Sequence, residues 1–389
     1  MGSASAAPAD VFKARFGTAG RQFSAPGRVN LIGEHVDYND GLALPMAIDR
    51  RTRVWASPRG DRRLSVIAYD LGEEAELDLD APARLTGTWR DYVAGVAFHL
   101  ERAGFRLGGA NLLVTSDVPA GAGLSSSAAL EVAVGFALLA LAGHDIDRLA
   151  LACAGQAAEH DFVGTRCGLM DQFVAAHARA GRAIRLDCRT RDFDLIPLDA
   201  TQCAVVVADT GKRHRLATSA YNARRRECET ALTTLRQKRP ALSSLREVTP
   251  ADLDAALAEL SAPLARRVRH VVTEIERVEA FARALAASDW TRAGALLTDS
   301  HRSLREDYEA SCAELDALVA AAQAAPGCHG ARMTGGGFGG CTVNLVAPAA
   351  LEAFLREVPL AYERATGRAT RLWVVAPSDG VGETIPERA

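Results

Sequence analysis

The chain has almost no lysine. Of its 45 basic residues only Lys13, Lys212 and Lys238 are lysines, and the rest are arginines. The 48 acidic residues slightly outnumber the basic ones, which gives a formal net charge of −3. A surface that binds nucleic acid or an anionic membrane usually carries a basic excess, so the charge balance argues against both partners. Contacts to phosphate groups are therefore expected from arginine or from the backbone.

Long apolar runs are missing too. The longest, at residues 128–142, is too short to cross a membrane and contains Glu131. The first ten residues are small and polar, without the basic stretch and apolar core of a secretory signal. We expect a cytoplasmic protein with no membrane partner.

Closely spaced cysteines are absent as well. No two of the eight cysteines lie within ten residues of each other, so no zinc-binding spacing occurs. A chain of 389 residues can bury a large core without disulfides. We expect reduced, mostly buried thiols.

The common nucleotide-binding motifs are also missing. The sequence has no GxxxxGK[ST] loop and no protein-kinase VAIK or HRD motif. The dipeptide Gly211-Lys212 lacks the upstream glycine and is followed by Arg213. A nucleotide would have to be bound by another architecture.

Strand-like and helix-like segments occur in both halves of the chain without regular β–α alternation. This order indicates an α+β protein of two lobes rather than a Rossmann sheet or a barrel. We expect the lobes at residues 10–180 and 181–389. The expected strands are 53–57, 64–69, 75–79, 111–116, 184–186, 204–209, 341–346 and 372–376, and the expected helices are 92–102, 125–141, 147–160, 169–177 and 350–366, with further helices across 218–325.

Residues 119–129, PAGAGLSSSAA, have the composition of a phosphate-binding loop between a strand and a helix. Glycine lets the backbone approach a ligand closely, and the unpaired N–H groups at a helix start bind phosphate. The serine hydroxyls add donors, or an oxygen ligand for Mg²⁺. The alternative is an ordinary capped helix, but one serine would be enough for a cap.

Residues 26–41, PGRVNLIGEHVDYNDG, gather short polar side chains around glycines. Among them are Arg28, Glu34, His35 and Asp37. Such a set suits a hydroxyl-rich ligand, because each hydroxyl group both donates and accepts a hydrogen bond. A surface loop is the alternative. A metal site is a weaker one, because adjacent residues rarely point to one ion.

Residues 330–341, GARMTGGGFGGC, run directly into a predicted buried strand. Gly335, Gly336 and Gly337 remove side chains where another group must come close. A flexible linker would not be expected between a helix and a buried strand. We interpret the segment as a ligand-lining loop.

Together the three segments resemble the signature motifs of the GHMP kinases, the family of galacto-, homoserine, mevalonate and phosphomevalonate kinases. Within that family they are most similar to the galactokinase branch. GRVNLIGEHVDYNDG resembles its N-terminal signature, GLSSSAALE its phosphate loop and RMTGGGFGG its third motif. Val36 departs from the threonine common there, and Ser125 stands where the wider family prefers glycine.

The resemblance implies a GHMP kinase fold with two lobes. The N-terminal lobe would be like ribosomal protein S5 domain 2 and the C-terminal lobe ferredoxin-like, with the active site between them. The implied reaction is phosphoryl transfer from MgATP to the C1 hydroxyl of galactose, giving galactose 1-phosphate as the first committed step of galactose catabolism. The implied ligands are a sugar, ATP and Mg²⁺, and a monomer is expected.

Matching residue by residue carries functional residues over to this chain. A fourth segment, residues 158–173, resembles the catalytic stretch, with Asp171 beside the C1 hydroxyl and Arg28 opposite it. Either Asp171 acts as a general base, or Arg28 and Mg²⁺ mainly stabilise a loose transition state. The resemblance places the sugar at Glu34, His35, Asp37, Gly168, Asp171 and Tyr221, ATP at Trp89, Tyr92, Gly121, Gly123, Leu124, Ser125, Ser126 and Ser127, Mg²⁺ at Ser127 and Glu159, and the ligand-lining loop at Gly335, Gly336 and Gly337.

Related kinases for N-acetylgalactosamine, arabinose or galacturonate share these motifs and remain alternatives. They would need more room at C2 or different contacts at C6 of the sugar. A non-catalytic galactose sensor is a further alternative. Known sensors of this kind have a damaged phosphate loop, whereas residues 125–129 are intact here and Arg28 and Asp171 are both present. An enzyme is therefore favoured.

Overall fold

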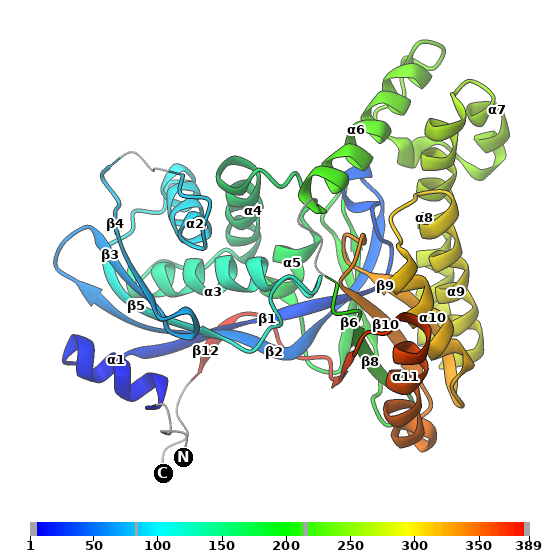
Figure 1. Ribbon diagram of the computed structural model, residues 1–389. Helices are drawn as coiled ribbons and strands as arrows, with labels where there is room; N and C mark the ends of the chain where they lie inside the picture. The colour runs from blue at the N-terminus through cyan, green and yellow to red at the C-terminus, as the bar shows by residue number, and fades with distance from the viewer. Residues whose placement is uncertain (1–5, 82–84, 213–216, 385–389) are drawn as a thin grey trace.

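A computed structural model describes residues 6–81, 85–212 and 217–384. The expectation that the first ten residues form no leader falls partly on residues 1–5, outside this range. Two β-sheets organise the molecule (Figure 1). The first has eight strands in the order β12-β1-β2-β5-β3-β4, with β6 paired to β2 and β7 to β6. The second has four strands in the order β11-β8-β10-β9.

The strands are β1 (Arg21–Ile32), β2 (Leu42–Arg59), β3 (Arg63–Ala68), β4 (Glu73–Asp78), β5 (Gly109–Ser116), β6 (Arg182–Asp187), β7 (Phe193–Pro197), β8 (Ala204–Asp209), β9 (Cys328–Thr334), β10 (Cys341–Val346), β11 (Arg371–Val375) and β12 (Gly382–Thr384). The α-helices are α1 (Pro8–Phe16), α2 (Arg90–Arg102), α3 (Ser126–Leu141), α4 (Arg148–Ala158), α5 (Met170–His177), α6 (Ala217–Arg236), α7 (Leu253–Leu257), α8 (Ala262–Ala286), α9 (Trp290–Glu306), α10 (Ala313–Ala324) and α11 (Leu351–Thr366). A π-helical turn, Glu159–Val163, extends α4.

Helices cover both faces of the first sheet (Figure 1). The helices α2 to α5 lie on one face, where their apolar residues and those of the strands form one buried core. On the other face Phe12 of α1 packs against Ile67 and Leu113. Helix α3 is apolar on most of its surface because it lies between the first sheet and helices α2, α4 and α5.

The second sheet is buried on both faces, and β8 shows how. Its side chains alternate, because successive residues of a strand point to opposite faces. Val206 and Ala208 face α10 and α11. Val205 and Val207 face a core that includes residues of β1 and β2 and of α8 and α9. This shared core joins the two sheets, and the ends of β1 and β9 meet at their junction.

The end of the chain returns to the first sheet. β12 pairs antiparallel with β1, with Gln22 opposite Thr384, and β6 pairs with β2 through Leu42 and Asp187. Segments on both sides of residue 180 therefore contribute to one sheet. The expected division at residues 10–180 and 181–389 stays a prediction.

The main difference from the predicted elements is at residues 26–41, for which the sequence predicts one polar segment, with a surface loop as the alternative. Its first part is the buried strand β1, and only the residues after Ile32 leave the sheet. The 18-residue strand β2 was predicted only at its end, and β9 was missed. Strands buried on both faces lack the alternation by which a strand is recognised.

Two further expectations can be compared with the structure. The cysteines are less buried than expected, since only Cys203, Cys228 and Cys341 are fully buried and the other five are half-buried. No helix in the part of the chain that the structure describes is both long enough and apolar enough to cross a membrane.

Candidate active site

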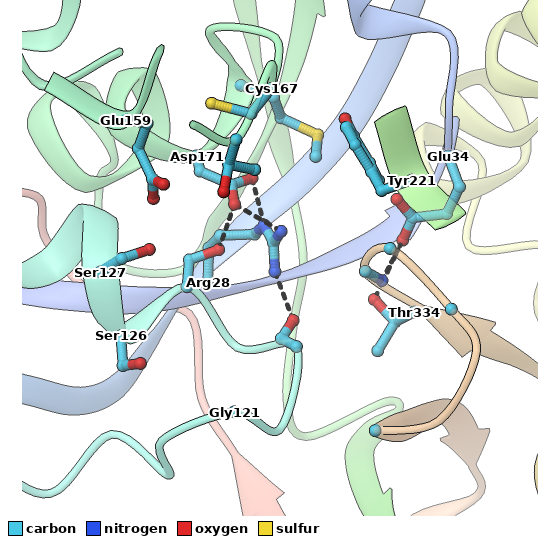
Figure 2. Close-up of a pocket in the computed structure, with 18 of the residues that line it drawn as sticks. Arg28, Glu34, Gly121, Ser126, Ser127, Glu159, Cys167, Asp171, Tyr221 and Thr334 are labelled. Atoms are coloured by element: carbon cyan, nitrogen blue, oxygen red, sulfur yellow. Dashed lines mark hydrogen bonds and ion pairs between the residues drawn. The ribbon is translucent and has the colours of Figure 1, made fainter. Parts of the chain in front are cut away.

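A cavity of about 390 Å³ lies where the two sheets meet. Its walls come from the end of β1, the loop before α3, the start of α5, the start of α6 and the loop between β9 and β10 (Figure 2). All four segments singled out from the sequence contribute to it, although they are far apart in the chain. Figure 2 shows the phosphate-loop serines and Glu159 on one side, Glu34 and Tyr221 on the other, and Arg28 and Asp171 between them.

Arg28 and Asp171 form a two-bond ion pair in the middle of the cavity. Nε and Nη2 of Arg28 donate to Oδ1 and Oδ2 of Asp171, each at 2.7 Å. The third guanidinium nitrogen, Nη1, donates to the carbonyl of Gly123 at 2.6 Å. The planar fork of arginine fits a carboxylate in this way, so both side chains are held in one orientation. The pair joins β1, α5 and the phosphate loop.

The phosphate loop is anchored on β1 through a glycine. A Cβ atom at Gly27 would lie 2.7 Å from the carbonyl oxygen of Leu124, so only glycine allows this approach. The pairing of β1 with β2 shifts register next to Gly27, between Pro26 and Arg28. At this irregularity the N–H of Arg28 leaves the ladder and donates to the carbonyl of Leu124 at 3.1 Å. The same irregularity therefore places the catalytic candidate and the loop together.

Ser125 precedes α3 in the left-handed conformation, with φ 58° and ψ 47°. Its hydroxyl donates to Oδ2 of Asp171 at 2.5 Å and does not cap the helix. The capped-helix alternative is therefore wrong for this serine. The first N–H groups of α3, from Ser126 and Ser127, remain available at the cavity, with the positive end of the helix dipole. This is the arrangement that binds phosphate groups at helix starts.

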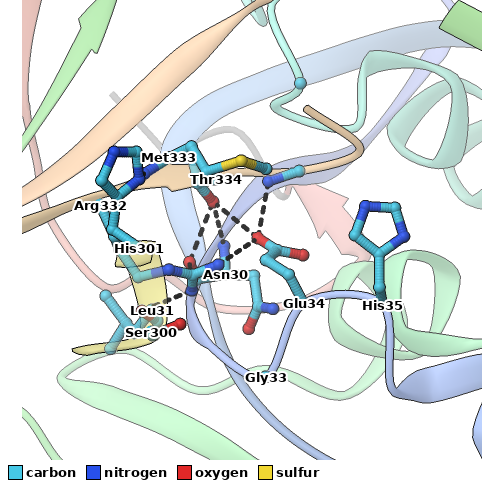
Figure 3. Close-up of polar contacts among 12 residues, drawn as sticks. Asn30, Leu31, Gly33, Glu34, His35, Ser300, His301, Arg332, Met333 and Thr334 are labelled. Atoms are coloured by element: carbon cyan, nitrogen blue, oxygen red, sulfur yellow. Dashed lines mark hydrogen bonds and ion pairs between the residues drawn. The ribbon is translucent and has the colours of Figure 1, made fainter. Parts of the chain in front are cut away.

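Glu34 belongs to a buried polar network below the opposite end of the cavity (Figure 3). Its Oε1 accepts hydrogen bonds from the N–H of Gly335 at 2.6 Å and from the hydroxyl of Thr334 at 3.2 Å, and lies 3.3 Å from Nη2 of Arg332. Burial raises the pKa of Glu34, while Arg332 and Arg28 partly counteract this effect. The network ties the first motif to the glycine-rich loop of the third.

Asp37 lies against Gly168. A Cβ atom at Gly168 would come within 2.1 Å of Oδ2 of Asp37, so the glycine makes the space that this carboxyl group occupies. Burial, together with the negative charges of Asp171 and Glu34, raises the pKa of Asp37 to about 7.

An aromatic cluster closes the cavity on the side of Glu34. The ring of Tyr221 lies 5.2 Å from that of His35 and 5.5 Å from that of Tyr38, measured between centroids. Burial, and to a smaller degree the neighbouring His270, lowers the pKa of His35 to about 3, so the imidazole is neutral. Tyr221 is a half-buried aromatic of α6 that lines the cavity, and its expected contact with a sugar stays a prediction.

Glu159 lies at the other end, at the junction of α4 and its π-helical turn. Burial raises the pKa of Glu159 to about 7, against the effect of a hydrogen bond with Ser127. π-Helical turns are rare and often occur at functional sites. Glu159 and Ser127 thus place side-chain oxygen atoms that could ligate a cation together at the cavity wall.

Most of the residues expected at the site line the cavity, but three do not. Leu124 is buried in the core between the sheets and contributes its backbone carbonyl. Gly168 lies behind Asp37. Trp89 is half-buried against the core of the first sheet, and its Nε1 donates to Glu73 at 2.7 Å. The expected residues that line the cavity are Arg28, Glu34, His35, Asp37, Tyr92, Gly121, Gly123, Ser125, Ser126, Ser127, Glu159, Asp171, Tyr221, Gly335, Gly336 and Gly337.

Several lining residues were not predicted. Lys212 is one of two basic residues among the described residues that line the cavity, and its Nζ forms an ion pair with Glu314 at 2.7 Å. Nothing near it in the sequence indicated a site. Thr334 could have been found, since it lies within the third motif. The others are Thr165, Cys167, Met170, Gly339 and Gly340.

Comparisons with known proteins agree with this geometry. The galactokinase galactose-binding signature matches residues 10–58, the GHMP kinases N terminal domain residues 91–179 and the GHMP kinases C terminal domain residues 281–364. A galactokinase of Roseiflexus sp. (strain RS-1) is 48% identical over 361 residues, which are 93% of this chain and 92% of the relative. A galactokinase of Chloroflexus aggregans (strain MD-66 / DSM 9485) is 49% identical over 92% of both chains.

The chain belongs to the galactokinase family of the GHMP kinases.

The fold of this galactokinase-family chain is similar to that of solved structures over almost its whole length. A Lactococcus lactis galactokinase complexed with galactose superposes with a TM-score of 0.93 at 36% identity, covering 97% of this chain and 98% of that one. The Methanococcus jannaschii mevalonate kinase, at 17% identity and a TM-score of 0.66 over 93% of this chain and 99% of that one, shares the fold. The expected two-lobed GHMP kinase fold is confirmed. The chain is a sugar kinase that uses ATP as a substrate.

Proposed function

We propose that this chain transfers the γ-phosphoryl group of ATP to the C1 hydroxyl of α-D-galactose, releasing galactose 1-phosphate and ADP as the first committed step of galactose catabolism. The observation that carries the proposal is the position of the Arg28–Asp171 pair. It lies between the polar groups around Glu34 and the phosphate loop before α3. A phosphoryl group that passes from ATP to a sugar must cross this point.

The sugar would occupy the end of the cavity formed by Glu34, His35, Asp37 and Tyr221. These groups offer acceptors, a donor and an aromatic wall, which suit the hydroxyls and the apolar ring face of a sugar. Gly168 makes the room that Asp37 needs. The similar Lactococcus lactis galactokinase was crystallised with galactose, which favours galactose as the sugar.

Asp171 has one acceptor position left for the sugar. Among the described residues, its Oδ2 accepts from Arg28 and Ser125, whereas its Oδ1 accepts only from Arg28. Each carboxylate oxygen has two lone pairs, so Oδ1 retains one for the C1 hydroxyl. Asp171 then orients this hydroxyl and accepts its proton as a general base. Arg28 balances the charge of the carboxylate and stabilises the charge on the transferred group.

The phosphates of ATP would lie on the N–H groups of Ser126 and Ser127 and on the backbone of Gly121 and Gly123. The left-handed Ser125 turns the chain into α3 here, so that the helix start faces the cavity. This backbone site explains how a chain with three lysines binds a polyanion. Lys212 adds a positive charge at the cavity wall.

Ser127 and Glu159 are proposed to hold Mg²⁺. Both present hard oxygen atoms, and the described residues include no group of three or more acidic, histidine or cysteine side chains that could hold an ion by themselves. This fits Mg²⁺, which takes one or two protein oxygens and completes its shell with phosphates and water. When bound, the ion neutralises charge that develops on the phosphates.

For adenine, Tyr92 is favoured over Trp89. Tyr92 lines the cavity at the end of the phosphate loop, whereas the indole of Trp89 is engaged with Glu73. We keep Trp89 in the proposal as a wall behind Tyr92. Substituting Tyr92 should therefore raise the KM for ATP more than substituting Trp89.

The proposal also covers where and in what form the enzyme works. It places the enzyme in the cytoplasm as a monomer, which fractionation and light scattering would test.

For the lobes, the pairing of β6 and β7 with the first sheet favours a boundary after Pro197 rather than at residue 180.

A coupled ADP-release assay tests the substrate. Galactose, N-acetylgalactosamine, arabinose and galacturonate are compared at saturating MgATP, and the product is identified by ³¹P NMR. We expect the highest kcat/KM with galactose and phosphate on C1. Faster turnover of another sugar would replace the substrate, and no turnover of any sugar would support the sensor instead.

The role of Asp171 is tested by replacing it. We expect Asp171→Asn and Asp171→Ala to lower kcat on the order of 10²-fold or more, because neither side chain accepts a proton at neutral pH. The matched control is Asp254→Asn on the exposed surface of α7. A small effect of Asp171→Asn together with a large loss for Arg28→Ala would favour the electrostatic mechanism instead.

A further inference from the structure

A chain of hydrogen-bonded side chains leads from His35 away from the cavity. Nδ1 of His35 lies 2.7 Å from the hydroxyl of Tyr38, which lies 2.7 Å from the hydroxyl of Tyr308. The hydroxyl of Tyr308 lies 3.1 Å from Sγ of Cys228. On the cavity side, Nε2 of His35 lies 3.2 Å from the carbonyl oxygen of Gly336. We call these four side chains, His35, Tyr38, Tyr308 and Cys228, the His35 relay.

The relay connects parts of the chain that meet only in the folded protein. His35 and Tyr38 follow β1, Tyr308 lies between α9 and α10, and Cys228 belongs to α6. Three of the four are fully buried, with exposures of 3% for His35, 2% for Cys228 and none for Tyr308. Water therefore cannot replace a missing partner without cost.

The hydrogen positions in the relay follow from its two ends. The carbonyl of Gly336 can only accept, so Nε2 of His35 must carry the proton that faces it. The imidazole is neutral, and its Nδ1 is therefore an acceptor. Tyr38 has a single hydroxyl proton and must donate it to Nδ1.

The same counting fixes the rest of the relay. Because the proton of Tyr38 is used, its oxygen accepts from Tyr308. The single proton of Tyr308 is then used as well, so its oxygen accepts from the thiol of Cys228. Each residue of the relay therefore donates its hydrogen bond to the next residue on the side of the cavity.

We propose that Tyr38, Tyr308 and Cys228 are positioning residues that hold His35 in its Nε2–H form, so that the sugar end of the cavity always presents a donor at this position. The inference rests on the proposed sugar kinase function for its consequence, but not for its hydrogen-bond assignment. With Nε2–H fixed, His35 donates to the carbonyl of Gly336 in the glycine-rich loop, and a sugar hydroxyl oxygen would share this N–H with that carbonyl or replace it as the acceptor. A hydroxyl placed here would be recognised as an acceptor.

Phenylalanine substitutions separate hydrogen bonding from packing. The ring of Tyr308 lies 4.7 Å from that of His35 and 4.5 Å from that of His270, so Tyr308→Phe keeps these ring contacts and removes only the hydroxyl. Tyr362→Phe is the matched control. Its buried hydroxyl donates to the carbonyl of Thr210 at 2.9 Å, directly after β8 and outside the relay.

The tautomer is read by NMR of the full chain labelled with ¹⁵N-histidine, with His35→Gln identifying the signal. We expect His35 to be protonated on Nε2 in the unmodified protein and in Tyr362→Phe. In Tyr38→Phe the Nδ1 atom loses its donor, so a mixed population of both tautomers is expected. Tyr308→Phe should cause a smaller change.

Kinetics give a second, graded readout. We expect Tyr38→Phe to raise the KM for galactose about tenfold, the effect of one hydrogen bond, with the KM for ATP and kcat changed less than about twofold. Tyr308→Phe should have a smaller effect, and Cys228→Ala a smaller one again. Cys228→Ser keeps a donor to Tyr308 and should restore the unmodified KM.

The outcomes distinguish this inference from the proposed function. His35 protonated on Nδ1 in the unmodified protein, or an unchanged tautomer in both Tyr38→Phe and Tyr308→Phe, would overturn the relay. If Tyr38→Phe does not fold, Tyr308→Phe and the Cys228 pair decide the question by the same two readouts. A confirmed tautomer in a protein that phosphorylates no sugar would overturn the proposed function and leave the relay standing.

Discussion

Gly168 acts through the atom that it lacks. A Cβ atom there would lie 2.1 Å from Oδ2 and 2.3 Å from Cγ of Asp37, so Gly168→Ala must displace that carboxyl group. A misplacement on the order of 1 Å at an active site can cost about 10²-fold. We expect the KM for galactose to rise at least about tenfold, with the KM for ATP unchanged.

The matched control for this steric argument is Gly108→Ala. A Cβ atom at Gly108 would meet nothing within 4 Å. It should leave both KM values unchanged. If Gly168→Ala also left the KM for galactose unchanged, Asp37 would not contact the sugar.

Glu159 makes the stability of the ligand-free protein depend on pH. Burial raises its pKa from 4.5 to about 7. Between these values the folded protein keeps a proton that the unfolded chain releases, so stability falls as pH rises through this window. Glu159→Gln has no proton to release. Its free energy of unfolding should therefore rise relative to the unmodified protein by about 3 kcal/mol between pH 4.5 and pH 7.5.

Urea unfolding without nucleotide or metal, at a series of pH values, checks this prediction. The control is Glu352→Gln, an exposed glutamate of α11. Its difference from the unmodified protein should stay constant with pH. A constant difference for Glu159→Gln would show that folding does not raise the pKa of Glu159.

At the scale of an element, the start of α3 combines backbone strain with a side-chain contact. Ser125 adopts φ 58°, which glycine tolerates and other residues reach at a cost of about 1 kcal/mol. Its hydroxyl contributes a bond to Asp171. The conformation gives a physical reason for glycine at this position in the wider family, and the hydroxyl a reason for serine here.

Two substitutions separate these effects. Ser125→Ala and Ser125→Gly both lose the bond to Asp171, so both should lower kcat by roughly tenfold. Only Ser125→Gly relieves the strain, and it should be more stable than Ser125→Ala by about 1 kcal/mol. Chemical denaturation of the pair measures the difference, and equal stabilities would contradict the backbone argument.

The elements differ in how far the sequence predicts them. Helix α3 and strand β10 were predicted within a few residues, because a glycine stop or a bounded apolar run marks their ends. β1 and β2 were mostly missed. Their residues are buried on both faces where the sheets join, and a pattern made by one exposed face does not exist there.

At the scale of the whole molecule, the end of the chain is fastened to the first sheet by Arg51. Its guanidinium donates to the hydroxyl and carbonyl of Ser24 and to the carbonyls of Asp379 and Gly380, at 2.7 to 3.1 Å. We expect Arg51→Ala to lower the free energy of unfolding by about 2 to 4 kcal/mol, since it leaves several half-buried carbonyls without a donor.

Kinetics at 25 °C should be unaffected by Arg51→Ala, because Arg51 does not line the cavity. Arg50→Ala, at the neighbouring position, is the control and should change neither stability nor activity. Loss of activity without loss of stability in Arg51→Ala would mean that the return of the chain shapes the cavity instead.

The sequence by itself determined which segments carry the chemistry. Glycine runs, clustered serines and short polar side chains are requirements of close approach and hydrogen bonding, and these requirements are local. The phosphate loop and the polar segment that contains Arg28 were found in this way, whereas Asp171 was found only through the family resemblance, which also supplied the roles. The signature residues of the galactokinase family were readable before any contact was known.

Only the tertiary structure decided what those residues face. Contacts in the cavity join positions that are far apart in the chain. Arg28 binds Asp171, Asp37 fills the space beside Gly168, and Lys212 lines the wall. The direction of the His35 relay depends on Tyr308 and Cys228, which no local pattern marks. These side chains come within hydrogen-bonding distance only when the two sheets pack together. Their contacts therefore cannot be predicted from local sequence patterns.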